Sequence, residues 1–178
     1  MQVTFLMLKY VIVILLITNA NMKACIILSS SIGFSTLNNT NLELATIEHT
    51  IFRATKMHNI NLLNSDLNNV TLAGCILDGN LYDASSFDDL IISRSTLNDL
   101  IYQIGPIGSR KAYTSYFVNK DNVRCGCWNN YKGGTLEEFK NEVEKTYPSG
   151  EYHDEYMIAI ETFKKYRELY LKSKKGDK

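Results

Sequence analysis

Residues 61–75, NLLNSDLNNVTLAGC, place leucines at positions 62, 67 and 72. An amphipathic helix returns an apolar residue to the same face after three or four positions, and a strand does so after two. A five-residue spacing fits neither element alone. It therefore indicates an internal repeat with a unit of five residues, and this repeat decides the fold of about half the chain.

The repeat extends in both directions from Leu62. Steps of five residues reach an aliphatic or aromatic side chain every time, at Ile17, Met22, Ile27, Ile32, Leu37, Leu42, Ile47, Phe52, Met57, Leu62, Leu67, Leu72, Leu77, Tyr82, Phe87, Ile92, Leu97 and Tyr102. The residue two places earlier is usually small, as at Ala20, Cys25, Ser30, Ser35, Thr40, Ala45, Thr50, Thr55, Ser65, Cys75, Ser85 and Ser95. The pattern predicts two inward and three outward side chains in each unit.

Charged residues support this assignment of faces independently. Residues 20–102 contain four basic and eight acidic side chains, and none of them occupies the large apolar position or the small position. Because charged side chains are rarely buried without a partner, both positions are expected to face the interior.

Four five-residue units can form one turn of a square coil, with the small residue allowing the backbone to turn at each corner. Residues 20 apart then stack at strand spacing, about 4.8 Å. The sequence therefore predicts that Phe52 lies between Ile32 and Leu72 in the stack. A single unit cannot bury its apolar residue, whereas stacked coils bury a continuous core.

The units NANMK (19–23), NTNLE (39–43), NSDLN (64–68) and NVTLA (69–73) resemble the A(D/N)LXX unit of pentapeptide repeat proteins. The resemblance implies a mainly β fold. Over residues 17–104 it implies a right-handed quadrilateral β-helix of about four coils. Some members of this family bind DNA gyrase by presenting an acidic rod.

A different pattern begins after residue 104, where Gly105, Pro106 and Gly108 mark a boundary. Aromatic and β-branched runs at 112–118 and 123–128 predict a β-hairpin. The spacing of Thr135 and Glu138 is typical of a capping box that opens a helix, and residues 148–150 end that helix.

A second helix is expected over residues 151–172, so that residues 105–178 form a small α+β unit. Its tyrosine-rich stripe is expected to pack on the end of the solenoid or on another chain. The layout of this unit resembles a segment that follows pentapeptide repeats in some bacterial and phage proteins, and this second resemblance implies no activity.

The apolar N-terminus, residues 1–16, is expected to form a first strand or a cap. Lys9 interrupts the apolar run, which is too short to span a bilayer, so no membrane association is expected. A signal peptide over residues 1–20 is the alternative, because a charge, an apolar stretch and small residues follow in that order. Without it, the protein is expected in the cytoplasm.

Two short segments contain candidate site residues. Ser109, Arg110 and Lys111 follow a glycine-rich stretch and are suited to binding an anion, although such a turn also occurs at a plain domain junction. Cys125 and Cys127 are weak metal candidates, because zinc needs four ligands and no second cysteine pair is present. Buried strand cysteines are the simpler interpretation. No catalytic residue and no cofactor are predicted.

These observations favour a non-enzymatic binding or interaction protein of a bacterium or phage, with a rigid platform and a C-terminal recognition unit. A protein partner or a second copy of the chain is expected, and zero net charge argues against direct nucleic-acid binding. One alternative is a DNA mimic that binds gyrase, although a net charge of −4 over residues 20–102 is small for that role. Another is a binder of, or enzyme acting on, a small anionic ligand at the junction.

Overall fold

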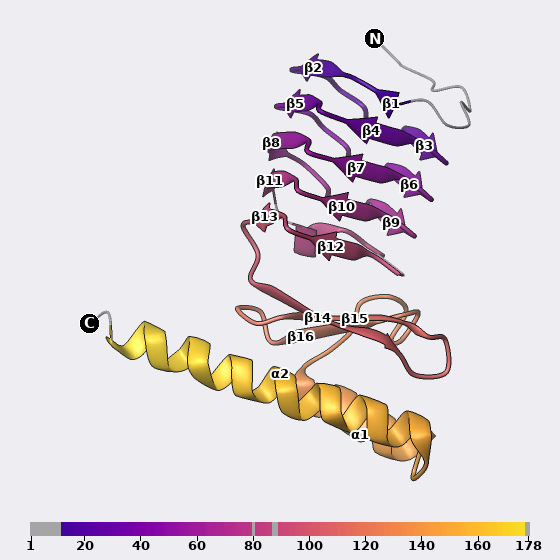
Figure 1. The fold of residues 1–178 in the computed structure, drawn as a ribbon, viewed down its shortest axis with the longest axis vertical. Coiled ribbons are helices and arrows are strands. Elements are labelled where there is room, and N and C mark those ends of the chain that lie inside the picture. Colours follow the sequence, from indigo (N-terminus) through magenta and orange to yellow (C-terminus); the bar gives the residue numbers. More distant parts are fainter. Residues whose placement is uncertain (1–11, 80, 87–88, 177–178) are drawn as a thin grey trace. The chain divides into compact units, whose positions relative to one another are not determined.

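The computed structural model describes residues 12–79, 81–86 and 89–176, which divide into two compact units, residues 1–99 and 100–178. The first is a stack of short parallel strands, and the second combines a small antiparallel sheet with two helices (Figure 1). Most of the apolar N-terminal stretch lies outside the described residues, as does the repeat position at Phe87. The chain divides slightly before the boundary expected at residue 104.

Three parallel sheets form sides of the first unit. One contains β1 (Ile12–Val13), β4 (Ser31–Gly33), β7 (Ile51–Arg53), β10 (Thr71–Ala73) and β12 (Ile91–Ser93). The second contains β2 (Leu16–Thr18), β5 (Thr36–Asn38), β8 (Lys56–Ile60), β11 (Ile76–Gly79) and β13 (Thr96–Leu97). The third contains β3 (Ile26–Leu28), β6 (Thr46–Glu48) and β9 (Asp66–Asn68), and single bridges join Asn21, Asn41 and Asn61 on a further side. The result is a β-solenoid of about four coils.

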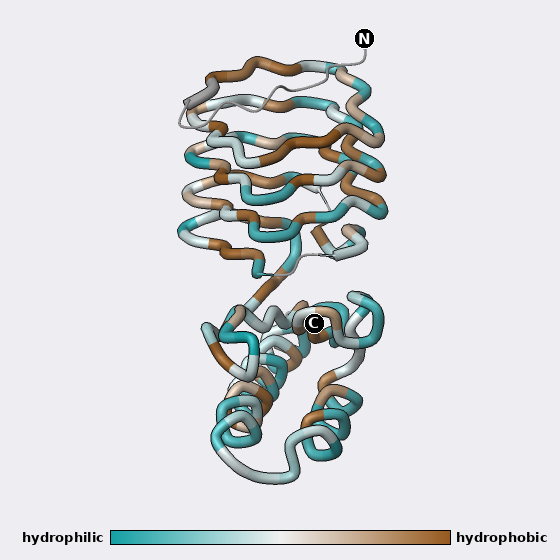
Figure 2. The backbone as a smooth tube through the Cα atoms, turned by 90° about the vertical axis from the view of Figure 1, so that its right-hand side faces the viewer, coloured by the Kyte–Doolittle hydropathy of each residue, from teal (hydrophilic) through white to brown (hydrophobic). Residues whose placement is uncertain are grey.

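The strand register confirms the predicted stacking. Phe52 pairs with Ile32 on one side and Leu72 on the other, a shift of 20 residues each time. Every large apolar position from Met22 to Leu77 is buried. Figure 2 shows the stacked coils, with apolar residues recurring along each of them.

The small inward residues bury their hydroxyl groups without leaving them unpaired. Thr50 donates to the carbonyl of Glu48 at 2.9 Å, and Ser65 donates to that of Leu62 at 2.8 Å. A buried hydroxyl without a hydrogen bond is costly, so these local bonds explain why serine and threonine are tolerated inside the coil.

The corners of the coil depend on a different repeat position. Positive φ angles recur every five residues, at Asn19, Ala24, Ser29, Phe34, Asn39, Leu44, His49, Ala54, Asn59, Asn64, Asn69 and Gly74. Asparagine adopts this left-handed conformation more readily than most residues. The side chain of Asn39 also donates to Asn19 at 2.8 Å, and that of Asn59 donates to Asn39 at 2.9 Å. The turn is therefore made at this outward position rather than at the small inward residue.

The last coil departs from the repeat. Pairing between β11 and β8 shifts at Gly79, which lies opposite Ile60 instead of a residue 20 positions earlier. A short 3-10 helix, η1 (Leu81–Asp83), follows. Leu81 is consequently buried in the centre, whereas Tyr82, the expected central residue, is only half-buried.

The second unit contains an antiparallel sheet of β14 (Ile101–Ile107), β15 (Ala112–Phe117) and β16 (Asn122–Cys125). The hairpin between β15 and β16 was predicted. Strand β14 was not, because Gly105 and Pro106 within it indicate a turn. The pairing with β15 is irregular between Ile104 and Ile107, where proline cannot donate to the ladder.

Two helices, α1 (Leu136–Thr146) and α2 (Glu151–Gly176), complete this unit. Neither described helix combines the length and apolar character needed to cross a bilayer. The stripe on α2 belongs to the core of its own unit, with Tyr156, Ile160 and Phe163 buried against residues of the sheet and α1. That core consists of Tyr116, Val118, Val123, Phe139, Val143, Tyr156, Ala159, Ile160 and Phe163.

The predicted capping box at the start of α1 is present. Thr135 Oγ1 accepts from the Glu138 backbone N–H, and the Glu138 carboxylate accepts from the Thr135 backbone N–H. We expect Thr135→Ala to lower the free energy of unfolding by about 1 kcal/mol, because the backbone N–H of Glu138 loses its acceptor. Urea unfolding measures the change, and Thr135→Ser should restore most of it. Equal stability of the alanine variant would contradict this prediction.

Candidate functional site

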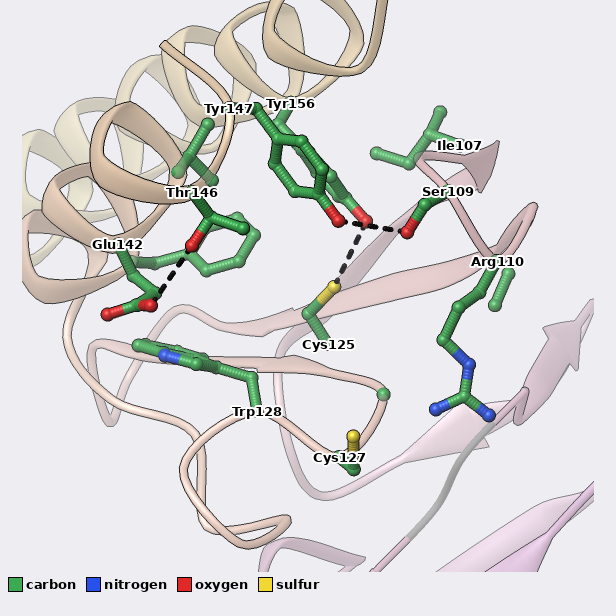
Figure 3. Close-up of a pocket in the computed structure, with 14 residues that line it drawn as sticks. Ile107, Ser109, Arg110, Cys125, Cys127, Trp128, Glu142, Thr146, Tyr147 and Tyr156 are labelled. Atoms are coloured by element: carbon green, nitrogen blue, oxygen red, sulfur yellow. Dashed lines mark hydrogen bonds between the residues drawn. The ribbon is translucent and has the colours of Figure 1, made fainter.

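The second unit contains an open cavity of about 200 Å³ (Figure 3). It lies among the β14–β15 turn, the end of β16 with its following loop, α1 and one residue of α2. Its lining consists of Ile107, Ser109, Arg110, Ala112, Cys125, Gly126, Cys127, Trp128, Phe139, Glu142, Val143, Thr146, Tyr147 and Tyr156.

Aromatic rings form much of the cavity wall. The rings of Trp128 and Phe139 have centroids 5.1 Å apart and are tilted by 54°. Phe139 meets Tyr156 edge to face at 5.8 Å, and Tyr147 stacks near Tyr156 at the same separation. These tilted and offset arrangements are favourable for aromatic pairs, so the wall is held by its own contacts.

Polar groups lie around this aromatic wall. The hydroxyls of Ser109 and Tyr147 are hydrogen-bonded at 2.9 Å, which joins the β14–β15 turn to the end of α1. Arg110 is exposed and lines the cavity on the side of the same turn. Glu142 lines it from α1 and accepts from the Thr146 hydroxyl at 3.1 Å. The cavity therefore combines an apolar wall with a cation and a carboxylate.

The turn that carries Ser109 and Arg110 is anchored to α2. Glu155 accepts from the backbone N–H of Gly108 at 2.6 Å and from Lys111 Nζ at 2.8 Å, and Lys111 also reaches Glu151 at 3.3 Å. Gly108 has a φ of 70°, and a Cβ atom there would collide with the phenol of Tyr156. The backbone at this turn thus requires glycine.

The structure brings some of the predicted site residues together and separates one. Ser109, Arg110, Cys125 and Cys127 all line the cavity, although they come from two different parts of the sequence. Lys111 is not a lining residue, because its ammonium group pairs with two glutamates on α2. The pair Ser109 and Arg110 is therefore the part of the anion-binding prediction that faces the cavity.

The two cysteines occupy different environments. β16 ends at Cys125, which is half-buried and accepts a hydrogen bond from the Thr114 hydroxyl at 3.4 Å, whereas Cys127 is exposed in the loop. Neither of these two cysteines forms a disulfide bond. Within the described ranges, no group of three or more His, Cys, Asp or Glu side chains is arranged to hold a metal ion.

Sequence reasoning missed Trp128, Tyr147 and Tyr156 as lining residues, because their positions depend on how the helices pack on the sheet. Burial raises the pKa of Tyr156 far above its ordinary value, so its hydroxyl stays neutral and can donate or accept a hydrogen bond. Trp128 is followed by three consecutive residues with positive φ, at Asn129, Asn130 and Tyr131.

Side chains hold this left-handed loop in place. Arg124 donates to the carbonyl of Tyr131, Asn122 donates to that of Lys132 at 3.3 Å, and Asn129 donates to that of Gly133 at 2.6 Å. Left-handed backbone is costly for residues other than glycine and persists only where the surroundings determine it. These bonds therefore fix the backbone of the residues that directly follow Trp128.

The bonds of Glu155 to the β14–β15 turn predict that the stability of the fold depends on pH. The hydrogen bond from Lys111 and that from Gly108 lower the pKa of Glu155 below its ordinary value of 4.5. A carboxyl with a lowered pKa stabilises the fold above its ordinary pKa, and this stabilisation is lost as the pH falls through the lowered value.

We therefore expect Glu155→Gln to be less stable than the original protein at neutral pH. The difference should shrink as the pH falls below 4.5, where the unfolded chain becomes protonated first. Urea midpoints measured across this range provide the test. Glu161→Gln, which removes an exposed carboxylate from the same helix, is the control. A difference that stays constant down to acidic pH would contradict the assignment.

Comparison with models of known protein families, with curated proteins and with solved structures finds no match. The likeness of the first unit to pentapeptide repeat proteins is therefore carried by its five-residue pattern and by the 20-residue register of its coils. The site in the second unit is interpreted from its own geometry.

Proposed function

We propose that this is a non-enzymatic binding protein whose C-terminal unit receives a small ligand, or a side chain of a protein partner, in the cavity. The observation that carries this proposal is the cavity itself, whose lining combines aromatic side chains with the polar residues Ser109 and Arg110 of the β14–β15 turn. Binding sites typically combine a mainly apolar concave surface with a few polar groups that fix the orientation of the ligand.

The cavity also has the features of a site formed before binding. The β14–β15 turn is fixed by the bonds of Glu155, and the loop after Trp128 is fixed by side chains that bond to its carbonyls. A site whose walls are already ordered loses less conformational entropy when a ligand binds. In this proposal the solenoid is a rigid platform, because its stacked coils share one continuous core.

A fluorescence titration tests the proposal directly, because Trp128 is the only tryptophan in the sequence and it lines the cavity. We would titrate the full-length protein with single-ring compounds that are anionic, neutral or cationic. At least one class should change the tryptophan emission in a saturable way.

A variant that fills the cavity mouth provides the control. Thr146 lines the cavity from the exposed end of α1, so Thr146→Phe should weaken the response at least tenfold. Asn141→Phe adds the same ring at another exposed position of α1, which does not line the cavity, and should leave binding unchanged. If no compound in the panel produces a saturable change, the binding proposal is wrong.

A further inference from the structure

Resting on the proposed binding function, we infer that the cavity selects a trimethylammonium group, which lies over the ring of Trp128 with Tyr147 and Glu142 beside it. The inference names the chemical class of the ligand. A cation is attracted to the face of an aromatic ring, and tryptophan attracts it most strongly. Three properties of the cavity support this choice: its accessible rings, the position of its carboxylate, and the apolar character of the remaining lining.

Trp128 and Tyr147 are aromatic lining residues that a ligand can reach. Both are half-buried, whereas Phe139 and Tyr156 belong to the core of the unit. Trp128 contacts Phe139 at a tilt of 54°, and Tyr147 is stacked near Tyr156, so the buried rings support the accessible ones. Figure 3 shows Trp128 and Tyr147 on opposite sides of the Cys125 thiol. A small cation can therefore contact both accessible rings without separating any of these pairs.

The carboxylate of Glu142 adds a negative charge beside these rings. Glu142 lies one turn along α1 from Phe139, which contacts Trp128, and side chains three positions apart on a helix are neighbours. The Glu142 side chain is 41% exposed; one of its oxygens accepts from the Thr146 hydroxyl at 3.1 Å, and the other lies 3.9 Å from Lys145 Nζ. An exposed pair of this kind offsets little of the charge, so Glu142 still favours a cation.

The rest of the lining favours a methylated cation over a primary ammonium. Ile107, Ala112 and Val143 line the cavity with apolar groups. A primary ammonium is strongly hydrated and has three donors, so it loses hydrogen bonds to water in such surroundings. A trimethylammonium group has no N–H and presents methyl groups instead. It is similar in size to benzene, which an apolar cavity of about 150 Å³ holds, so the cavity of about 200 Å³ has room for it.

Arg110, the cation among the lining residues, does not occupy the same end of the cavity. Figure 3 shows Arg110 on the far side of Cys125 and Cys127 from Glu142. Arg110 also already interacts with other groups of the protein. Because repulsion between like charges weakens with distance and with salt, the cation is expected at the end where Glu142 and Trp128 lie.

Choline and 3,3-dimethylbutan-1-ol test the requirement for charge, because the two molecules have the same shape and differ only in whether the central atom is a charged nitrogen or a neutral carbon. Titrations of the full-length protein would follow the emission of Trp128 and the heat of binding. Choline is expected to bind at least tenfold more tightly than the alcohol.

The same chemical group can come from a free small molecule or from a methylated lysine of a protein partner. A five-residue peptide with a central trimethyllysine, and the same peptide with unmodified lysine, test the second source. The methylated peptide is expected to bind at least tenfold more tightly than the unmodified one, because only the unmodified ammonium has to give up hydrogen bonds to water.

Variants of Trp128 assign the preference to its ring. Trp128→Leu should remove the preference for choline and leave the affinity for the alcohol within about threefold, because leucine keeps an apolar wall but has no ring face. Trp128→Phe should retain part of the preference, which separates the loss of a tryptophan ring from a folding defect. Calorimetry measures both variants, since Trp128 is the only tryptophan in the sequence.

A pair of glutamate variants tests the carboxylate. Glu142→Gln should weaken choline binding at least threefold and leave binding of the alcohol unchanged, because glutamine keeps the shape and removes the charge. Glu144→Gln is the control. Glu144 belongs to the same helix and its side chain is 47% exposed, but it does not line the cavity, so this variant should retain the full preference.

The outcomes distinguish this inference from the proposed function. If choline and the alcohol bind equally, or if the lysine peptide binds as tightly as its trimethylated form, the inference is wrong. Unchanged preference in Trp128→Leu or in Glu142→Gln would also overturn it. The binding proposal still stands in these cases if a single-ring compound gives a saturable response. If no compound of either set binds, the proposed function fails together with the inference. Tighter binding of the trimethyllysine peptide than of choline would identify a protein partner as the source.

Discussion

Replacing Ile47 by aspartate is expected to prevent the first unit from folding. Ile47 is 1% exposed and lies in β6, between Ile27 of β3 and Leu67 of β9. A carboxylate there has apolar neighbours above and below it. Burying an unpaired charge costs several kcal/mol, which is a large fraction of the whole stability of a typical domain.

The neighbouring Glu48 provides a matched control. It belongs to the same strand but to an outward repeat position, and Glu48→Ala should change the free energy of unfolding by less than about 0.5 kcal/mol. Circular dichroism and limited proteolysis with mass mapping would locate the damage. A folded, protease-resistant Ile47→Asp solenoid would contradict the two-inward, three-outward assignment.

Phe163→Ala is expected to lower the free energy of unfolding of the second unit by about 3–5 kcal/mol. Phe163 is fully buried on α2 and contacts Tyr116 of β15, with ring centroids 5.1 Å apart. Truncation leaves a cavity between helix and sheet, and the surrounding residues can close it only partly. The unit has 79 residues, residues 100–178, so this loss removes much of its stability.

Trp128 makes this measurement specific to the second unit, because no other tryptophan is present in the sequence. Its emission during urea unfolding reports the transition of the unit that carries the cavity. Leu169→Ala is the control, since Leu169 is 61% exposed on the same helix and its truncation should cost less than about 0.5 kcal/mol. Equal midpoints for both variants would show that α2 does not depend on Phe163 for its packing.

The solenoid could be predicted because the residues that determine it recur at a short, fixed spacing along the sequence. A single unit shows a weak pattern, but repetition from residue 17 to residue 102 makes the inward positions readable without a structure. The capping box of Thr135 and the buried stripe of α1 were readable for the same reason, since both depend on residues three or four apart. The left-handed corners were missed because their residues range from asparagine to Phe34 and Leu44.

The candidate site was predictable only in part. The glycine-rich turn directed attention to Ser109 and Arg110, and the cysteine pair stood out by its spacing. The sequence grouped Lys111 with the anion site, whereas the fold pairs it with Glu151 and Glu155, about 40 residues away. Strand β14 was hidden because Gly105 and Pro106 lie inside it.

By itself the sequence determined the coil, its register and the helices of the second unit, because each depends on periodic burial or on contacts within one turn. Only the tertiary structure decided which side chains surround the cavity. Ser109, Trp128, Tyr147 and Tyr156 come from separate elements, and they meet because the helices cover one apolar core beside the sheet. These four residues come together only through packing between distant parts of the chain, which a local sequence pattern does not reveal.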